Sequence, residues 1–281
     1  MNAPAFGRPL PVDSLLHRRD PTIKLAVVLV VCLAITAVVD PITPTALYLL
    51  TWPAALLAGR IPVVTLLRAH IPFVAFAFSL LLVNATTRDG APIARVLALD
   101  ITSEGLTIGA GLAMRTLLIG IVSVTFVLTT DGARLMTSLH QHVRLSGRFA
   151  YAVLAGYRLL EQLPETWQTI RAAQAVRDPR RRERTGRDHR GRTVGPSTRP
   201  RALAHAAFTL LVTSLRRGER MSIALETRGL GAGRRTIAAP SDLRPADAVL
   251  AVVALGALAL VLGVSAHLGV LRGLGELGVF G

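Results

Sequence analysis

The 281-residue sequence contains a single cysteine and few of the groups that carry out chemistry. Cys32 lies inside an apolar run, so it cannot form a disulfide within the chain or join a cluster of thiolate ligands. The seven histidines are scattered, and neither an HExxH nor a GxxxxGK[ST] motif occurs. The sequence therefore predicts no metal site, no bound cofactor and no ATP hydrolysis by this chain.

Acidic residues are also scarce, and the basic ones are concentrated. The chain has 32 Lys plus Arg against 17 Asp plus Glu, for a net charge of +15. Residues 131–236 alone hold 21 Arg against 8 acids, a net +13, and apolar runs lie on both sides of them. Hydrophobic residues make up 51% of the chain. Because cytoplasmic loops of membrane proteins are rich in Lys and Arg, we expect residues 131–236 to be cytosolic.

Five apolar segments predict helices that cross a membrane. Asp20-Pro21 is expected to start the first helix, because the carboxylate can cap free backbone amides and proline suits the first helical position. The second segment is marginally short, because a crossing needs about 20 apolar residues. The opening residues lack an apolar stretch followed by a cleavage site, so we expect no removable signal. Four crossings within residues 23–130, counted from a cytosolic N-terminus at 1–22, return the chain to the cytosol. The expected spans are 23–39, 48–58, a third from about 61 or 71 to 83, 105–128, and 246–268, with an external loop at 84–104 and a tail at 269–281.

The basic region has its own helical pattern. Asp131 is placed to cap one helix, a second is expected from Ser146 to Arg177 with a kink at Pro164, and a third from about 201 to 228. The third helix is expected to carry an apolar side made of Leu203, Ala207, Leu210, Leu211, Ser214 and Leu215. The Arg-rich segment 178–200 between them has no apolar periodicity and is expected to be a mobile loop. The predicted fold is an all-α integral membrane protein with about five spans and a cytosolic domain of long helices.

Both long cytosolic helices are expected to end in an arginine, in the segments AAQAVRD at 172–178 and IALETRG at 223–229. One explanation is purely structural, because cations favour the negative end of a helix and glycine supplies its left-handed cap. The other is functional, since a guanidinium on a helix tip suits a partner's groove, where it makes forked hydrogen bonds to carboxylates or carbonyls. The residues alone leave both explanations open.

Arg115 lies within the fourth apolar segment, where a charge is costly unless it meets a partner or water. It is therefore a candidate functional residue, although an arginine near the interface can also extend its side chain outward to the headgroups. Asp247, at the start of the last span, is interpreted as interfacial. Trp52 and Trp167 are interpreted as packing or interface residues.

Several segments together resemble the T component (EcfT, or CbiQ-like) of energy-coupling-factor importers for vitamins and metal ions. The resemblance covers nearly the whole chain and includes the order of spans, cytosolic helices and final span. The matching pieces are HRRDPTIKL at 17–25, the arginine of LAMRTLLIG at 112–120, Thr129-Thr130, YRLLEQLPE at 157–165, AAQAVR at 172–177 and IALETRG at 223–229.

The resemblance implies coupling rather than catalysis. In that family the cytosolic helices end in Ala-Arg-Gly-like signatures, and each arginine docks on one of two ATP-hydrolysing subunits. Thr227-Arg228-Gly229 keeps the arginine and glycine of this signature. Val176-Arg177-Asp178 keeps only the arginine, and Asp178 is expected to weaken docking by pairing with Arg177.

The family's role would make this chain a non-catalytic subunit in the cytoplasmic membrane. It would pass ATP-driven movement to a small substrate-binding membrane protein, the S component, for uptake of a vitamin or a transition-metal ion such as cobalt. ATP would be used by the partner subunits.

A rival hypothesis is a membrane-anchored basic protein that binds nucleic acid or anionic lipid through the Arg-rich loop. Ten arginines and three acids lie in residues 177–201, and the sequence pI is about 11.6. No aromatic residue lies between Asp178 and Ala207 to stack on bases, so lipid headgroups are the better fit of the two. An intramembrane enzyme and a self-contained secondary transporter are disfavoured, because neither a polar catalytic cluster nor internal repeats are visible.

Overall fold

The computed structural model describes residues 12–88, 90–96, 99–143, 145–177, 200–229 and 241–270. They fall into two compact units. The apolar unit contains the described residues of Arg8–Ser138 and Ser241–Gly281, and the arginine-rich unit contains those of Leu139–Pro240. The chain thus passes from the first unit to the second after Ser138 and returns to it at Ser241.

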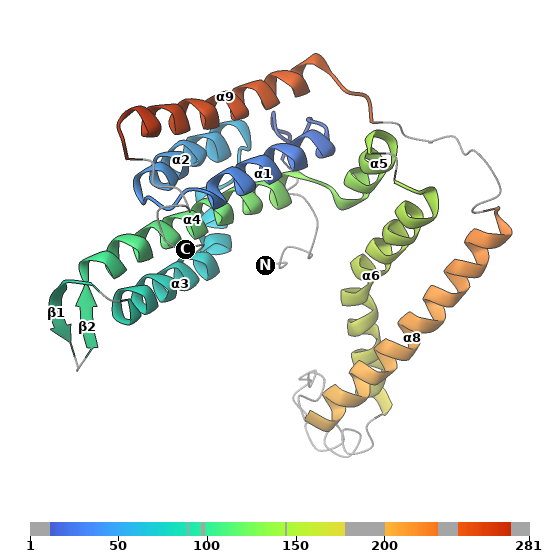
Figure 1. Cartoon of the computed structure of the whole chain (residues 1–281). Coiled ribbons are helices and arrows are strands. Elements are labelled where there is room, and N and C mark those ends of the chain that lie inside the picture. The colour runs from blue at the N-terminus through green and yellow to red at the C-terminus, as the bar shows by residue number, and fades with distance from the viewer. Residues whose placement is uncertain are drawn as a thin grey trace. The chain divides into compact units, whose positions relative to one another are not determined.

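The apolar unit is built of helices with one short hairpin (Figure 1). Helix α4 packs against α1, α2 and α3, and α9 packs against α1 and α2. In chain order the elements are α1 (Pro21–Thr36), α2 (Ile42–Pro53), the π-helical turn η1 (Ala54–Ala58), α3 (Val63–Thr87), β1 (Pro92–Val96), β2 (Leu99–Thr102), α4 (Ser103–Thr129) and α9 (Pro245–His267), with α5 (Gly132–His142) beginning in this unit.

Three of these helices, α3, α4 and α9, are long and apolar enough to cross a membrane. Helix α1 and the continuous segment Ile42–Ala58 are shorter apolar helices, and their residues overlap in sequence with the first two predicted spans. The predicted all-α membrane class is therefore confirmed. One local difference is the antiparallel hairpin of β1 and β2, which pairs Pro92 with Thr102 inside the segment expected to be a loop.

Helices α3 and α4 approach each other closely because glycines line their contact. A Cβ atom on Gly105 would overlap the backbone oxygen of Asn84, and one on Gly109 would lie 3.0 Å from the backbone oxygen of Leu81. Small residues allow such close backbone approach in membranes, where packing must replace the hydrophobic effect between helices. The glycines of α4 therefore fix the spacing of the longest helix pair in this unit.

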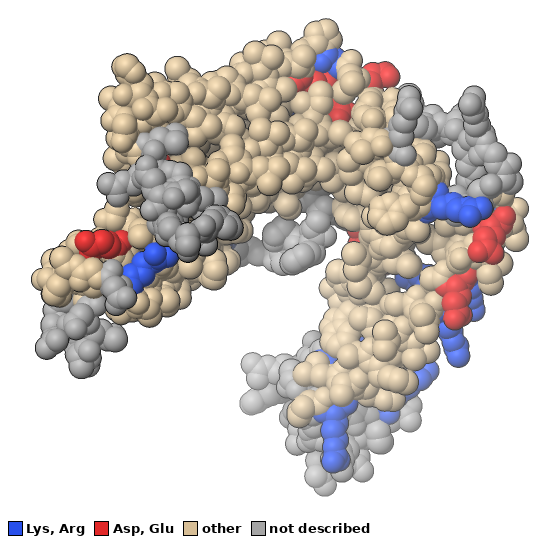
Figure 2. Space-filling view, viewed as in Figure 1, with Lys and Arg blue, Asp and Glu red and all other residues tan. Residues whose placement is uncertain are grey.

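The interior of the apolar unit is small compared with its apolar exterior. Large hydrophobic side chains remain exposed on the helices, for example Leu33 (72%), Leu57 (77%) and Val252 (69%). On the face seen in Figure 2, charged side chains are confined to the ends of this unit. Such an exterior suits a hydrocarbon environment. The buried core contains Ile35, Val38, Leu47, Ala55, Ile61, Leu66, Leu118, Ile121 and Leu258.

The arginine-rich unit is dominated by two long helices, α6 (Gly147–Arg177) and α8 (Pro200–Thr227), which run antiparallel to each other (Figure 1). The Arg217 Nη1 atom on α8 donates a hydrogen bond of 2.9 Å to Gln162 Oε1 on α6 and so fixes their register. Helix α6 continues through Pro164. The predicted loop falls almost wholly on residues 178–199, which lie outside the described part of the chain.

Candidate functional site

Arg177 is the last residue of α6, and it is exposed to solvent. Its neighbour Val176 is 74% exposed, so the tip of the helix presents both an apolar and a cationic side chain. A cation at this position is favoured by the partial negative charge of the helix C-terminus. Asp178 lies outside the described residues, so the predicted pairing of Asp178 with Arg177 stays a prediction.

Helix α8 ends in a glycine cap directly after its arginine. The Arg228 amide still donates to Ala224 O at 3.3 Å, and the Gly229 amide donates to Glu226 O at 2.8 Å. Gly229 has a φ of 74°, a left-handed conformation that glycine adopts without strain. The Thr227 hydroxyl is turned back onto Ala224 O at 3.1 Å. The predicted cap is confirmed, and it leaves Arg228 exposed just beyond the last regular turn.

The two arginines lie at opposite ends of the helix pair, because α6 and α8 are antiparallel. The contact between Gln162 and Arg217 marks a common level. Arg177 follows this level by 15 residues on one helix and Arg228 by 11 residues on the other. At 1.5 Å per residue the two tips are on the order of 40 Å apart. A single pocket of a partner cannot hold both guanidinium groups, so any docking through them involves two separate sites.

Helix α8 also exposes an apolar stripe. Phe208 (63%), Leu211 (65%) and Leu215 (64%) follow one another at spacings of three and four residues, which places them on one side of the helix. Ala206 is fully buried and lies on another side. The sequence predicted an apolar side of this helix that included Leu211 and Leu215, and the structure leaves both exposed within the described residues.

Arg115 is half-buried in α4 and its Nη2 atom donates a hydrogen bond to the backbone oxygen of Val38. Val38 follows the C-terminal end of α1, where carbonyl groups have no partner within the helix. The contact therefore joins α4 to the end of α1. A functional role for Arg115 stays a hypothesis.

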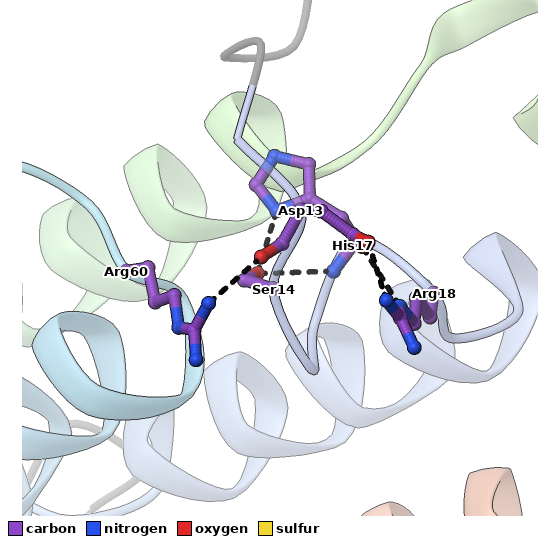
Figure 3. Close-up of polar contacts among 5 residues, drawn as sticks. All are labelled: Asp13, Ser14, His17, Arg18 and Arg60. Carbon is purple, nitrogen blue, oxygen red and sulfur yellow. Dashed lines mark hydrogen bonds and ion pairs between the residues drawn. The ribbon is translucent and has the colours of Figure 1, made fainter.

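The turn before α1 is held by surface contacts (Figure 3). Arg18 makes a two-pronged ion pair with Asp13, Ser14 Oγ lies 2.6 Å from His17 Nδ1, and Arg60 Nη1 donates to Asp13 O at 3.4 Å. The Asp13 and Arg18 side chains are each 65% exposed, and pairs so exposed contribute little stability.

A buried polar cluster just beyond this turn was only partly anticipated. Asp20 was predicted to start a helix, and its carboxylate does accept hydrogen bonds from the amides of Thr22 (2.8 Å) and Ile23 (3.4 Å). The same carboxylate also accepts hydrogen bonds from the hydroxyls of Ser138 and Ser241. Burial alone would raise the pKa of Asp20, but the hydrogen bonds from Ser241, Ser138 and the two amides hold it below the ordinary value of 3.8.

Asp247 and Lys24 are also more deeply buried than their sequence context indicated. Asp247 is 1% exposed and accepts hydrogen bonds from the amides of Asp20 (3.1 Å) and Arg244 (2.8 Å). Lys24 is 5% exposed, and its ammonium donates to Leu16 O (3.1 Å) and Thr129 O (2.8 Å). The distant partners of Asp20 and Lys24 lie 105 to 227 residues away in sequence, so no local motif reveals them.

Lys24 borders a cavity of about 480 Å³ among α1, α2, α4 and α9. Its lining is aliphatic or aromatic apart from Lys24 and the threonines at 51, 125 and 129. The lining residues include no carboxylate and no histidine. The carboxylates and imidazoles that would recognise a cationic or metal-ion ligand are thus not among them.

Comparison with known proteins gives consistent results. The family model CbiQ, described as "Cobalt transport protein", matches residues 13–237. The energy-coupling factor transporter transmembrane protein EcfT of Heliobacterium modesticaldum is 28% identical over 266 residues, which cover 91% of this chain and 95% of the relative. The EcfT of Bacillus selenitireducens is 28% identical over 240 residues, covering 81% and 84%.

A third relative differs in length. A Bifidobacterium longum protein named as an ABC transporter ATP-binding protein is 26% identical over 270 residues, which cover 91% of this chain but 33% of that protein. The family model spans most of the chain, and the first two relatives match 91% and 81% of it. With its apolar helices and its pair of long arginine-tipped helices, the chain belongs to the CbiQ family and is a multi-pass transmembrane T component of the EcfT type.

Proposed function

We propose that this chain is the non-catalytic coupling subunit of an energy-coupling-factor importer. In this proposal Arg177 and Arg228 each dock on one of two ATP-hydrolysing subunits. The carrying observation is that the two arginine-bearing ends point away from each other along one antiparallel helix pair. Closure of two ATPase subunits would then act on the two opposite ends of the α6–α8 helix pair.

The exposed chemistry of the tips supports such docking. A guanidinium offers five donors in a planar fork, which suits carboxylates and carbonyl groups on a partner surface. Gly229 ends α8 sharply and leaves Arg228 at the solvent-exposed end of the helix. The Bifidobacterium longum relative is named as an ABC transporter ATP-binding protein, and this name supports ABC-type ATPases as the partners.

The apolar stripe of Phe208, Leu211 and Leu215 supports a second kind of partner. A row of exposed large hydrophobic residues on a helix outside the membrane marks an interaction surface. We assign it to the small substrate-binding membrane protein, the S component. The cargo would be a vitamin or a transition-metal ion, and the name of the matching family model favours cobalt.

The orientation follows from charge. Residues 131–236 carry a net +13, and the bias of basic loops toward the cytosol places them on the side where ATP is available. The protein would therefore lie in the cytoplasmic membrane with the arginine-rich unit in the cytosol. The Arg-rich segment 178–199 is outside the described residues, and no structural observation favours the nucleic-acid alternative.

The test compares two charge reversals on α8. Arg228→Glu should abolish co-purification of the ATPase subunits from membranes. Arg220→Glu, a reversal at another exposed position within the same helix, should leave it intact. Arg177→Glu should have a weaker effect than Arg228→Glu. Normal membrane insertion of each variant is the control for folding. Equal ATPase recovery with wild type, Arg228→Glu and the variant carrying both reversals would refute the docking proposal, and salt-sensitive DNA binding through residues 178–201 would favour the rival.

A further inference from the structure

A polar cluster inside the apolar unit lies where the chain leaves this unit and where it returns. Ser138 is the last residue of the apolar unit before the chain passes into the arginine-rich unit, and Ser241 is the first residue after its return. Both hydroxyls donate to the carboxylate of one residue, Asp20, which directly precedes α1. Ser138 is 118 residues from Asp20 and Ser241 is 221 residues away.

The contacts are short and buried. Ser138 Oγ lies 2.8 Å from each carboxylate oxygen of Asp20, and Ser241 Oγ lies 2.5 Å from Oδ2. Ser138 is fully buried and Asp20 is 3% exposed. The Asp20 amide donates to Asp247 Oδ1 at 3.1 Å, and the other Asp247 oxygen accepts from the amide of Arg244 at 2.8 Å. The cluster therefore joins the start of α1, α5 and the start of α9.

The charge of Asp20 sets the direction of the hydrogen bonds. An ionised carboxylate only accepts, so the hydroxyl hydrogen of Ser138 must point to Asp20. Thr22 Oγ1, which lies 2.6 Å from Ser138 Oγ, must then be the donor in that contact. Hydrogen bonds to a charged acceptor are about twice as strong as neutral ones. The carboxylate thus orders the two hydroxyls around it and holds two segments that are distant in sequence.

We propose that Asp20 is a positioning residue that fastens both connections of the arginine-rich unit to α1 and, through Asp247, to α9. Movement of the arginine-rich unit is then passed to these two apolar helices and is not absorbed by bending of the connections. This inference rests on the proposed coupling function, but the fastening itself is a property of the chain alone. The two parts therefore have separate tests.

The fastening is tested on the full chain in detergent by hydrogen exchange. Asp20→Asn keeps the size of the side chain, removes the charge and replaces one acceptor oxygen by a donor. Amides of α5 and of residues 244–247 should exchange roughly tenfold to a hundredfold faster, the range expected for loss of a charged hydrogen bond. Asp13→Asn, which removes an exposed carboxylate from the same turn, is the matched control and should change neither segment. Unchanged exchange in Asp20→Asn would overturn the fastening.

Two serine variants separate the fastening from a general loss of stability. Ser138→Ala should loosen α5 and leave residues 244–247 protected, whereas Ser241→Ala should loosen residues 244–247 and leave α5 protected. Each variant retains the Asp20 carboxylate and the cap of α1. Faster exchange throughout the apolar unit in either variant would show a structural role without selective fastening and would overturn the assignment.

Transmission is tested in the assembled complex with the ATPase subunits. Spin labels at Val63→Cys on α3 and Val252→Cys on α9, both exposed positions, in a Cys32→Ala background report the distance between α3 and α9, the helix to which the movement is passed. A non-hydrolysable ATP analogue should shift this distance in the parent complex and in Asp13→Asn. In Asp20→Asn the shift should be lost or reduced at least twofold while ATPase recovery is unchanged. A full shift in Asp20→Asn would overturn the inference, whereas failure of the parent chain to recover ATPases would refute the proposed function.

Discussion

The separation of Arg177 and Arg228 leads to a quantitative prediction about ATPase binding. Truncating a charged side chain that is hydrogen-bonded at an interface typically costs 2 kcal/mol or more, which weakens binding about thirtyfold. The helix register places the two tips on the order of 40 Å apart, so they share no partner residue. Effects at sites this far apart add to within about 0.5 kcal/mol. Replacing both arginines by alanine should therefore weaken binding by about a thousandfold.

The assay is binding of purified ATPase subunits to the chain in lipid nanodiscs, measured for wild type, each single alanine variant and the double variant. Arg220→Ala serves as the control because it removes the same charge from an exposed position within α8. The ATPase concentration must span at least four decades to follow the double variant. A double variant that binds no more weakly than the worse single variant would show that the two residues act at one site. That result would refute the reasoning from the antiparallel geometry.

Three further predictions concern the apolar unit. Gly105→Ala should lower the free energy of unfolding by about 1–3 kcal/mol, because the new Cβ meets the α3 backbone. The control Gly256→Ala, with no atom within 4 Å of the added Cβ, should be neutral or slightly stabilising. Thermal unfolding in detergent compares the two variants, and equal effects would contradict the close α3–α4 packing. Because the pKa of Asp20 is lowered in the folded protein, its stabilising contribution is present above the ordinary value of 3.8 and is lost as the pH falls through the pKa of the folded state. The difference in melting temperature between wild type and Asp20→Asn should therefore be constant near neutral pH and shrink below about pH 4. Arg115→Met should destabilise the protein by about 1–3 kcal/mol through loss of the charged hydrogen bond to Val38 O, and a melting temperature equal to that of wild type would show that this contact contributes nothing.

Much of the secondary structure was predictable because it depends on local sequence. The Asp20-Pro21 start of α1, the Asp131 cap and the glycine after Arg228 were each predicted from adjacent residues, and each is found. Helix α9 begins and ends within one residue of the predicted fifth span. The β1–β2 hairpin was missed, because its two strands of five and four residues are too short to give a clear periodic signal.

The candidate site was predictable only as separate pieces. The sequence identified Arg177 and Arg228 as ends of helices, because capping residues and apolar periodicity mark where a helix stops. It could not show that the helices are antiparallel, since that depends on packing between residues such as Gln162 and Arg217. The distance between the two guanidinium groups, and with it the need for two partner sites, comes from the tertiary structure.

The sequence by itself determined the membrane class, the positions of the main helices and the family, because these follow from the order of apolar and basic segments and from short motifs. Tertiary structure alone decided which polar groups surround each buried charge. Asp20 finds Ser138 and Ser241, and Lys24 finds the carbonyl of Thr129, over separations of more than a hundred residues. A buried charge is stable only where donors or acceptors surround it, and in this chain the fold supplies them from segments that no local pattern connects.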